Sequence, residues 1–365
     1  MKAWQFYPQD KRLHLDELPV PDPRPNGVVI RVRSAMVLSY WREVLSGELG
    51  YAIPVDPFIP GTNAVGVIEA VGNEVFHLRI GQPVIASPHY AVDERTAEPA
   101  QILIGLSAMS SSRFDGVSDS GLALQRVWKD GVFAEYAHLP ASCVTPLDTT
   151  SSTDGHQWLS LAKLVVPYGG LLRGQLEAGE VVLVNGASGF FGSGGVLMAL
   201  AMGAGKVIAA GRNASALDEL AKSLSPRVFP VPLTGDQAVD TAKIGAAAIG
   251  KVDLALDLVG RAKSAVATSA ALHSLRRGGR LVLMGSCSEP LPVSMGEMLA
   301  NNWAIFGQFM YPKHAFANLV NMVVAGTLDL ESVRVVSFPL AELPRALDAA
   351  TKMRSLEMVT LDCGG

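Results

Sequence analysis

The clearest hydrophobic pattern begins at residues 181–184, where four apolar residues, three of them valine, stand in a row. A β-branched apolar run of this length is too short for a buried helix and is typical of a strand buried in a parallel sheet. Glycines interrupt the pattern, a helix of small residues is expected after Gly192, and a second apolar run follows at residues 206–210. This order predicts a β-turn-α-β unit.

From about Ser160 onward, apolar runs alternate with Ala-rich helical patterns, which predicts a doubly wound parallel sheet. The expected helices include residues 214–224 and 264–275. Three further apolar runs are expected to be strands: 252–259, 280–284 and 302–307. The last run is either an ordinary sheet edge or an edge where a partner subunit pairs to form a homodimer.

The pattern before residue 141 is different, because short β-rich segments such as 28–32 and 64–71 alternate with glycine and proline. This spacing predicts a small β-barrel. The proline-rich residues 19–25 are expected to form an extended arm, since such prolines cannot join a sheet interior. Residues 101–109 are predicted to be a short apolar element, and residues 110–120 a mobile loop.

The tail from residue 312 returns to helix, strand, helix and strand, and is expected to pack on the first domain. The fold class is therefore predicted as α/β, with a β-barrel domain and a Rossmann-type sheet. The expected boundaries are 1–160 for the barrel domain, 161–310 for the nucleotide-binding domain and 311–365 for the returning segment.

Composition narrows the class of protein. The 365 residues are 49% hydrophobic and 18% charged, which describes a globular protein with room for two cores. A net charge of −4 argues against nucleic acid or an anionic membrane as the main partner. No signal peptide or membrane span is expected. Cys143, Cys287 and Cys363 are too far apart for a metal knuckle or a disulfide framework, so a reducing cytoplasm is expected.

Gly186, Gly189 and Gly192 are spaced three apart, as a turn beneath a dinucleotide pyrophosphate requires. The first glycine allows the turn, the second allows the backbone to approach the phosphates, and the third allows close packing of helix and strand. The next helix would direct its free N–H groups at the pyrophosphate. The candidate cofactor-binding residues in this turn are Gly186, Ala187, Ser188, Gly189, Phe190, Phe191 and Gly192.

The chain reads Gly211, Arg212 and Asn213 after the second strand of this unit. An NAD site usually has an acid there to accept the ribose 2′-hydroxyl, whereas an NADP site has an arginine. Glycine leaves room for a 2′-phosphate and the guanidinium of Arg212 can bind it, unless Arg212 is only a solvated surface residue. The expected cofactor is NADP(H).

Together these features resemble the medium-chain dehydrogenase/reductase superfamily. Five segments in order carry the resemblance: residues 44–47, 60–68 and 131–136, the glycine turn at Gly186, and residues 278–285. The resemblance implies a GroES-like barrel domain, a Rossmann domain, an active-site cleft between them and hydride transfer at the nicotinamide C4. It also places Leu258, Val259, Met284, Gly285, Ser286, Gln308 and Phe309 at the nicotinamide and its ribose.

The chain differs from the zinc-dependent members of that family at the positions that bind zinc. Zinc alcohol dehydrogenases carry a cysteine where this chain has Leu38, and His-Glu where it has Thr62 and Asn63. There is no third ligand near Ala162 or Lys163, and these side chains cannot supply a catalytic zinc site. The structural zinc lobe is also absent, since residues 87–129 contain no cysteine. No metal is expected, and the histidines are expected to be surface or satisfied polar residues.

Without zinc, the chain resembles the quinone oxidoreductase and enoyl reductase branch. Tyr40, or alternatively Ser39, would supply a proton to the product, unless Tyr40 only packs at the cleft mouth. The resemblance puts Thr62 and Asn63 beside the substrate. His89 and Tyr90 either contact substrate or have a plain loop role.

Zinc would stabilise the alkoxide formed when a bare ketone is reduced, whereas a conjugated C=C bond yields an enolate that hydrogen-bond donors can hold. The expected function is therefore NADPH-dependent, zinc-independent reduction of an activated double bond in a small molecule such as an enone or quinone. Carbonyl or imine reduction, and a non-catalytic NADPH-binding sensor or structural protein, remain as alternatives.

Overall fold

The computed structural model describes residues 1–93, 95–109, 116–147, 155–250 and 252–364. The chain forms two compact units. The first contains Met1–Ala162, Val335–Met353 and Met358–Gly365, and the second contains Lys163–Arg334 and Arg354–Glu357. The expected returning segment, 311–365, is thus shared between the two units, because its first helix belongs to the second.

The first unit is built on a largely antiparallel sheet in the order β10-β5-β4-β3-β18-β17, with β9 paired to β3. The long strand β3 is its centre, because it pairs with β4, β9 and β18 and is buried over nearly its whole length. The seven strands are β3 (Gly27–Val37), β4 (Ala64–Val71), β5 (Pro83–Ala86), β9 (Tyr136–Pro140), β10 (Val144–Pro146), β17 (Arg334–Pro339) and β18 (Glu357–Asp362).

Smaller elements complete this unit. They are the hairpin β1 (Lys2–Tyr7) and β2 (Arg12–Glu17), the three-stranded sheet β6 (His89–Ala91), β7 (Gln101–Leu103) and β8 (Ser107–Ala108), the helices α1 (Trp41–Ser46), α2 (Asp119–Val127) and α10 (Leu343–Ala350), and 3₁₀ turns at Ala141–Cys143, Gln157–Ser160 and Leu340–Glu342. The apolar element expected at 101–109 is two short buried strands, because Gly105 turns the chain with φ of 70°.

The loop expected at residues 110–120 ends earlier than predicted. Ser118 is the N-cap of α2, and its hydroxyl oxygen accepts the N–H of Gly121 at 3.0 Å. This cap starts the helix at Asp119, so only the beginning of the expected loop remains, and its residues 110–115 lie outside the described part of the chain.

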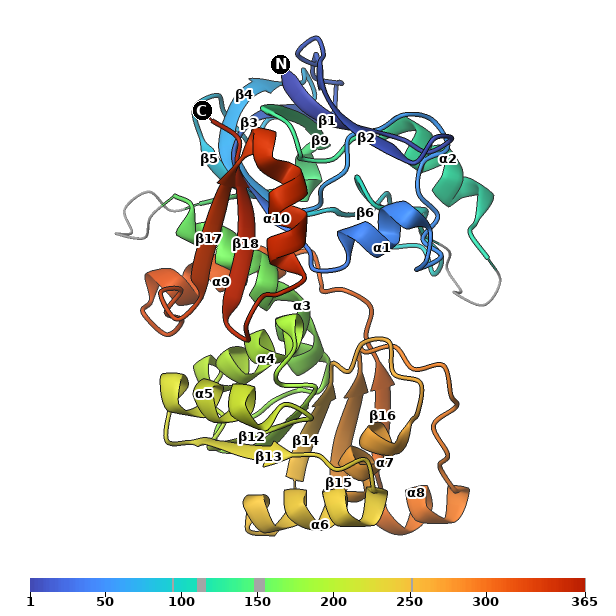
Figure 1. Ribbon diagram of the computed structural model, residues 1–365, viewed down its shortest axis with the longest axis vertical. Helices are drawn as coiled ribbons and strands as arrows, with labels where there is room; N and C mark the ends of the chain where they lie inside the picture. Colours follow the sequence, from blue (N-terminus) through green and yellow to red (C-terminus); the bar gives the residue numbers. More distant parts are fainter. Residues whose placement is uncertain (94, 110–115, 148–154, 251, 365) are drawn as a thin grey trace. The chain divides into compact units, whose positions relative to one another are not determined.

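The second unit contains a six-stranded parallel sheet in the order β13-β12-β11-β14-β15-β16. Figure 1 shows β14, β15 and β16 pointing the same way. The strands are β11 (Val181–Asn185), β12 (Lys206–Gly211), β13 (Val228–Pro232), β14 (Val252–Asp257), β15 (Leu275–Leu283) and β16 (Ala304–Gly307). Because β12 and β14 lie on either side of β11, the strand order reverses there, which makes the carboxyl ends of these strands the topological switch point of the sheet.

Seven helices of this unit lie in the described residues: α3 (Leu161–Arg173), α4 (Phe190–Ala201), α5 (Ala214–Leu224), α6 (Gln237–Ala248), α7 (Val266–His273), α8 (Met295–Asn301) and α9 (Ala315–Val324). The side chains of Ile244 on α6 and Leu272 on α7 pack on Leu183 and Ile208 of the sheet, and all four are buried. None of the described helices is both long and apolar enough to cross a membrane.

Two predicted boundaries were wrong at the end of α7. The helix expected to reach Leu275 ends at His273, and β15 starts five residues before the expected strand. The cause is an irregular pairing with β14: Leu275 pairs with Val252, the register then shifts, and Arg280 pairs with Leu254. The α/β fold class, with a doubly wound parallel sheet, is confirmed.

Candidate functional site

The turn between β11 and α4 is held by its own backbone. Gly186 has φ of 82°, a conformation that other residues rarely adopt. The N–H groups of Gly186 and Ala187 both donate to the carbonyl oxygen of Ala210 at 2.9 Å, and the N–H of Gly189 donates to the oxygen of Gly186 at 2.9 Å. The turn is therefore tied both to β12 and to itself.

Gly192 lies against this turn so closely that no other residue fits. A Cβ atom added there would stand 1.9 Å from the carbonyl oxygen of Gly186. At Gly189 the same oxygen would be 3.2 Å away, so that position is less constrained. Gly186 thus makes the turn, Gly189 leaves the backbone exposed, and Gly192 packs tightly on the turn.

The N-terminus of α4 is open. Its N-cap, Gly189, is exposed and has no side chain that could accept the first N–H groups of the helix. The rings of Phe190 and Phe191, 5.0 Å apart and edge to face, flank this end. Unsatisfied N–H groups at the positive end of a helix dipole suit a phosphate.

The three residues after β12 have different roles. A Cβ on Gly211 would lie 3.1 Å from Ser188 Oγ, so the strand end lies close to the glycine turn. Arg212 is exposed. Asn213 is the N-cap of α5, where its Oδ1 accepts the N–H of Ala216 at 3.2 Å. Of these three residues, Arg212 is the one that presents a charged group.

The ends of β14 and β15 meet through Asp257. Its carbonyl oxygen accepts the N–H groups of Met284 at 3.0 Å and Gly285 at 2.9 Å, and its carboxylate accepts that of Val259 at 2.9 Å. Burial raises the pKa of Asp257, while hydrogen bonds from Thr268 and Val259 lower it. Sequence reasoning missed Asp257, although an acid at the end of an apolar strand was a visible signal.

The other predicted nicotinamide residues gather at the same edge of the sheet. Ser286 donates its N–H to the oxygen of Val259 at 3.0 Å, and Gln308 donates its N–H to Leu283 at 3.0 Å. Leu258 follows β14 directly and is half-buried, while Phe309 is 48% exposed. The carboxyl ends of β11, β12, β14, β15 and β16 therefore carry all the residues that the sequence assigned to the cofactor.

A second cluster lies in the first unit, where β3 ends, β4 begins and β5 ends. Antiparallel pairing brings these ends together, since Met36 donates its N–H to the oxygen of Asn63 at 2.9 Å. Asn63 Nδ2 donates to the carbonyl oxygen of Ala86 at 3.0 Å. Leu38 directly follows β3, Thr62 lies just before β4, and both side chains are buried.

The donors in this cluster are not those of a metal site. Leu38 is apolar, and the Asn63 amide nitrogen is already bonded. The buried Thr62 Oγ1 has no hydrogen-bond partner among the described residues. A buried hydroxyl without a partner is costly and suits a polar ligand atom.

Tyr40 and Ser39 follow directly in the turn from β3 into α1, and both are half-buried. The carbonyl oxygen of Tyr40 accepts the N–H of Val44 at 3.0 Å, which fixes the residue at the helix start. Its ring stacks on Tyr51, with ring centres 6.3 Å apart and planes 7° from parallel. Tyr51 was not predicted, because nothing in the local sequence indicates this stacking.

His89 and Tyr90 lie on β6. The Nε2 atom of His89 is 3.1 Å from Gln101 Oε1 on β7. Tyr90 is buried with its ring edge to face with Trp128, and burial raises the pKa of its phenol, as does nearby Cys143. Both residues therefore have structural contacts within their own unit.

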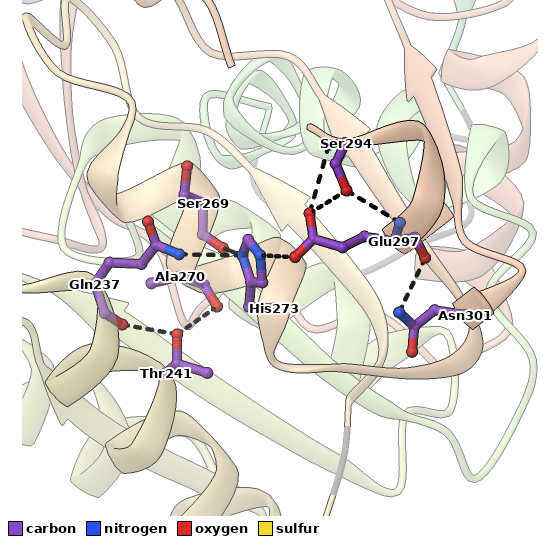
Figure 2. Close-up of polar contacts among 8 residues, drawn as sticks. All are labelled: Gln237, Thr241, Ser269, Ala270, His273, Ser294, Glu297 and Asn301. Atoms are coloured by element: carbon purple, nitrogen blue, oxygen red, sulfur yellow. Dashed lines mark hydrogen bonds and ion pairs between the residues drawn. The ribbon is translucent and has the colours of Figure 1, made fainter. Parts of the chain in front are cut away.

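No group of three or more histidine, cysteine, aspartate or glutamate side chains lies close enough to hold a metal ion within the described ranges. Figure 2 shows how His273 is satisfied instead. Its Nδ1 is 2.8 Å from the oxygen of Ser269 and 3.3 Å from Gln237 Nε2, and its Nε2 is 3.2 Å from Glu297 Oε1. This histidine joins three helices.

His138 is satisfied in another way. It accepts the N–H of Arg24 at 3.0 Å, and its ring lies 4.7 Å from that of Trp128. Burial, with the nearby guanidinium of Arg24, lowers the pKa of His138 to about 4. The side chain is therefore neutral near pH 7.

Two family models match the chain. The model for the alcohol dehydrogenase GroES-like domain matches residues 24–149, and the model for zinc-binding dehydrogenases matches residues 191–325. The acryloyl-coenzyme A reductase of Sulfurisphaera tokodaii is 30% identical over 330 residues, which cover 87% of this chain and 90% of that protein. The chain belongs to the medium-chain dehydrogenase/reductase superfamily.

Two further proteins are similar to this chain over nearly its whole length. The sorbitol dehydrogenase of Macaca fascicularis is 26% identical over 352 residues, 95% of this chain and 92% of that protein. The alcohol dehydrogenase TADH from Thermus sp. ATN1 has the same fold, with a TM-score of 0.77 at 23% identity over 99% of both chains. The protein is thus an oxidoreductase of this type. Since a reductase and an alcohol dehydrogenase both match, the choice of branch depends on the side chains of this chain's own site.

Proposed function

We propose that the protein is an NADPH-dependent, zinc-independent reductase that transfers a hydride to a C=C bond conjugated with a carbonyl group. One observation carries this proposal. A glycine turn suited to a dinucleotide is complete in the second unit, while the metal-ligand positions of the first unit hold Leu38, Thr62 and Asn63.

The chain fits the nicotinamide cofactor. The pyrophosphate would be held at the open N-terminus of α4, beside a turn in which Gly192 leaves no room for a Cβ. When bound, NADPH supplies the hydride from its nicotinamide C4. The backbone around Val259 and Gly285 would hold the nicotinamide side, since Asp257 fixes both segments.

Preference for NADPH is attributed to Arg212. Its guanidinium is exposed at the end of β12, and no acid stands at that position to repel a 2′-phosphate. An arginine can bind such a phosphate with two parallel hydrogen bonds. The neighbouring Asn213 instead serves as the helix cap of α5.

The residues do not fit a catalytic zinc ion, although the matching family model is named for zinc. Zinc in such sites needs thiolate, imidazole or carboxylate ligands, and Leu38 and Thr62 offer none. Without a metal, the negative charge formed on reduction is easier to accommodate as an enolate than as an alkoxide. The relative from Sulfurisphaera tokodaii is named for acryloyl-coenzyme A, whose double bond is conjugated with a carbonyl.

The polar groups of the first unit would then act on the substrate. The hydroxyl of Thr62 would donate to the substrate carbonyl oxygen, with Asn63 holding the strand ends in place. Tyr40, or Ser39 beside it, would supply the proton to the product carbon. His89 and Tyr90 on β6 would contact the substrate beside Thr62 and Asn63.

The test is a pair of titrations of the purified protein with NADPH and NADH, followed by a panel of enones, quinones and imines. Tighter binding of NADPH and a saturated carbonyl product are expected. Purified protein should contain no stoichiometric zinc, and a chelator should leave the rate unchanged. Metal-dependent activity would contradict the assignment at Leu38 and Thr62.

Carbonyl or imine reduction is the second candidate, favoured by the sorbitol dehydrogenase relative. It differs in its product, an alcohol or an amine. Tight NADPH binding without turnover on the whole panel would instead support a non-catalytic sensor or structural protein.

We also propose a homodimer formed through the second unit. Strand β16 is an edge of its sheet, and the adjacent α8 exposes Met295 by 84% and Leu299 by 78% on one face. Leu299→Asp should convert a dimer into a monomer in light scattering. The control is Ile249→Asp at the C-cap of α6, which is 83% exposed but lies away from this edge. A monomeric wild-type protein would end this proposal.

A further inference from the structure

Lys163 is a lysine without access to solvent. It stands in the first turn of α3 with 0% exposure, and its neighbours Leu161, Ala162 and Leu164 are also buried. Lysines are almost never fully buried without a paired charge. No ion pair joins the Lys163 ammonium to a carboxylate within the part of the chain that the structure describes.

The Lys163 ammonium lies against the first turn of α4. Its Nζ donates to the carbonyl oxygen of Phe190 at 2.6 Å and stands 3.9 Å from the centre of the Phe190 ring. A Cβ on Gly194 would lie 3.0 Å from the Lys163 carbonyl oxygen, so the small residue permits this approach of the two helices. Phe190 is the first residue of the helix that begins at the predicted phosphate-binding turn.

The other side of Lys163 faces the segment Arg354–Glu357 of the same unit. Nζ donates to the Glu357 carbonyl oxygen at 3.4 Å. The Glu357 carboxylate is engaged by Arg334 at 3.1 Å and by the N–H of Arg354 at 2.9 Å. Ser193 on α4 donates its hydroxyl to the oxygen of Ser355, which ties the segment to the same turn.

The charges around Lys163 do not balance it. Among the described residues, Glu357 is the acid whose charge favours the ammonium form of Lys163, but Arg334 already pairs with that carboxylate, and every residue of α4 is uncharged. Burial holds the pKa of the Lys163 ammonium well below its usual value. A cation beside the first turn of a helix is also repelled by the positive end of the helix dipole.

An anion bound at the N-terminus of α4 would offset both the positive charge of Lys163 and the positive end of the helix dipole. We infer that Lys163 is a positioning residue for the cofactor pyrophosphate: its ammonium holds the first turn of α4 through Phe190 and supplies a positive charge behind it that bound phosphates offset. The inference rests on the proposed nucleotide-binding function. It implies that cofactor binding and protonation of Lys163 favour each other.

The sign of the pH effects follows from the lowered pKa. In the free protein the unfolded chain binds the lysine proton more readily than the folded one, so the stability lost to the buried charge is regained as pH rises from the lowered folded-state pKa to the pKa of an unfolded lysine. Cofactor affinity runs the other way. It is highest where Lys163 is charged and falls as pH rises.

Two variants separate charge from hydrogen bonding. Lys163→Met keeps the length of the side chain without charge or donor, and Lys163→Gln keeps a donor without charge. Dissociation constants for NADPH and NADH would be measured from about pH 6 to about pH 9, with melting temperatures of the cofactor-free proteins. Both variants should bind about tenfold more weakly than wild type at the acid end, with the gap closing as pH rises.

Free Lys163→Met should melt no lower than wild type, because an apolar side chain replaces an unpaired buried charge, and its advantage should be greatest at low pH. Wild-type affinity in either variant at every pH would overturn the inference. So would full rescue by Lys163→Gln, or a weakening that does not change with pH in a variant that melts lower. If wild type binds neither nucleotide, the proposed function fails together with this inference. If wild type binds NADPH and the Lys163 variants bind it equally well, only this inference fails.

Discussion

The two units build their candidate sites in different ways. In the second unit the site is mainly backbone: a glycine turn, open N–H groups of α4 and strand ends fixed by Asp257. In the first unit it is made of side chains, with Thr62 and Asn63 at one strand end and Tyr40 at another. A backbone site needs particular small residues at fixed spacing, whereas a side-chain site needs only that strands pair in the right register.

Buried ionisable groups also distinguish the units. The second unit buries Lys163 beside the first turn of α4 and Asp257 between the ends of β14 and β15, and burial shifts the pKa of each toward its neutral form. In the first unit, Thr62 and Tyr40 offer only neutral hydroxyl groups. In the proposed function, the second unit binds the charged cofactor with buried ionisable groups nearby. The first unit holds an enolate oxygen and delivers one proton, for which neutral hydroxyl groups are enough.

The largest effect is expected from Gly192→Ala. Its new Cβ would stand 1.9 Å from a backbone oxygen, so the turn must open. We expect a loss of about 3 kcal/mol in the free energy of unfolding and no measurable NADPH binding. Urea unfolding and fluorescence titration measure both.

The matched control is Gly245→Ala in α6, where the nearest atom would be 3.6 Å away. It should gain about 0.5 kcal/mol from helix propensity and bind NADPH normally. Equal behaviour of the two alanine variants would contradict the role given to the tight turn.

Tyr40→Phe should have the next largest effect, in the first unit. It removes the hydroxyl and keeps the ring stacked on Tyr51. We expect kcat to fall about 100-fold while the dissociation constant for NADPH stays unchanged. Tyr51→Phe is the control, with normal turnover expected. If Tyr40→Phe also turns over normally, Tyr40 is a packing residue and Ser39 becomes the donor to test.

Arg212→Ala tests the nucleotide preference. Loss of a charge-assisted pair with the 2′-phosphate should weaken NADPH about 10-fold to 30-fold and leave NADH within about twofold. The control is Arg277→Ala, an exposed arginine on β15 that should change neither affinity. Equal weakening of both nucleotides would remove Arg212 from the 2′-phosphate.

The smallest effect concerns His138 and pH. Its folded-state pKa of about 4 lies below that of an unfolded histidine, so between about pH 6.5 and pH 4 the unfolded chain binds the extra proton and stability falls with falling pH. His138→Gln keeps an acceptor for Arg24 and should lose less of its melting temperature over this range. His77→Gln, an exposed position, should behave as wild type.

The sequence predicted the second unit better than the first. The alternation of strands and helices, the glycine turn and the helix at residues 214–224 were predicted, because each is set by local periodicity and caps, whereas β13, α6 and α8 were not named. The boundary between α7 and β15 was wrong, because irregular pairing with β14 decides it. Tyr51 was missed because nothing in the local sequence indicates its stacking on Tyr40, and Asp257 was missed although its place at the end of an apolar strand was a visible signal.

What the sequence alone determined is the class of protein and the place of its glycine turn, because glycine conformations and apolar runs act over a few residues. Only the tertiary structure decided which side chains share a site. Pairing of β4 with β5 lets the Asn63 side-chain amide donate to the carbonyl oxygen of Ala86, and helix packing leaves Lys163 buried against Phe190. The physical reason is that pairing and burial depend on contacts between distant segments, and desolvation then sets which groups carry charge.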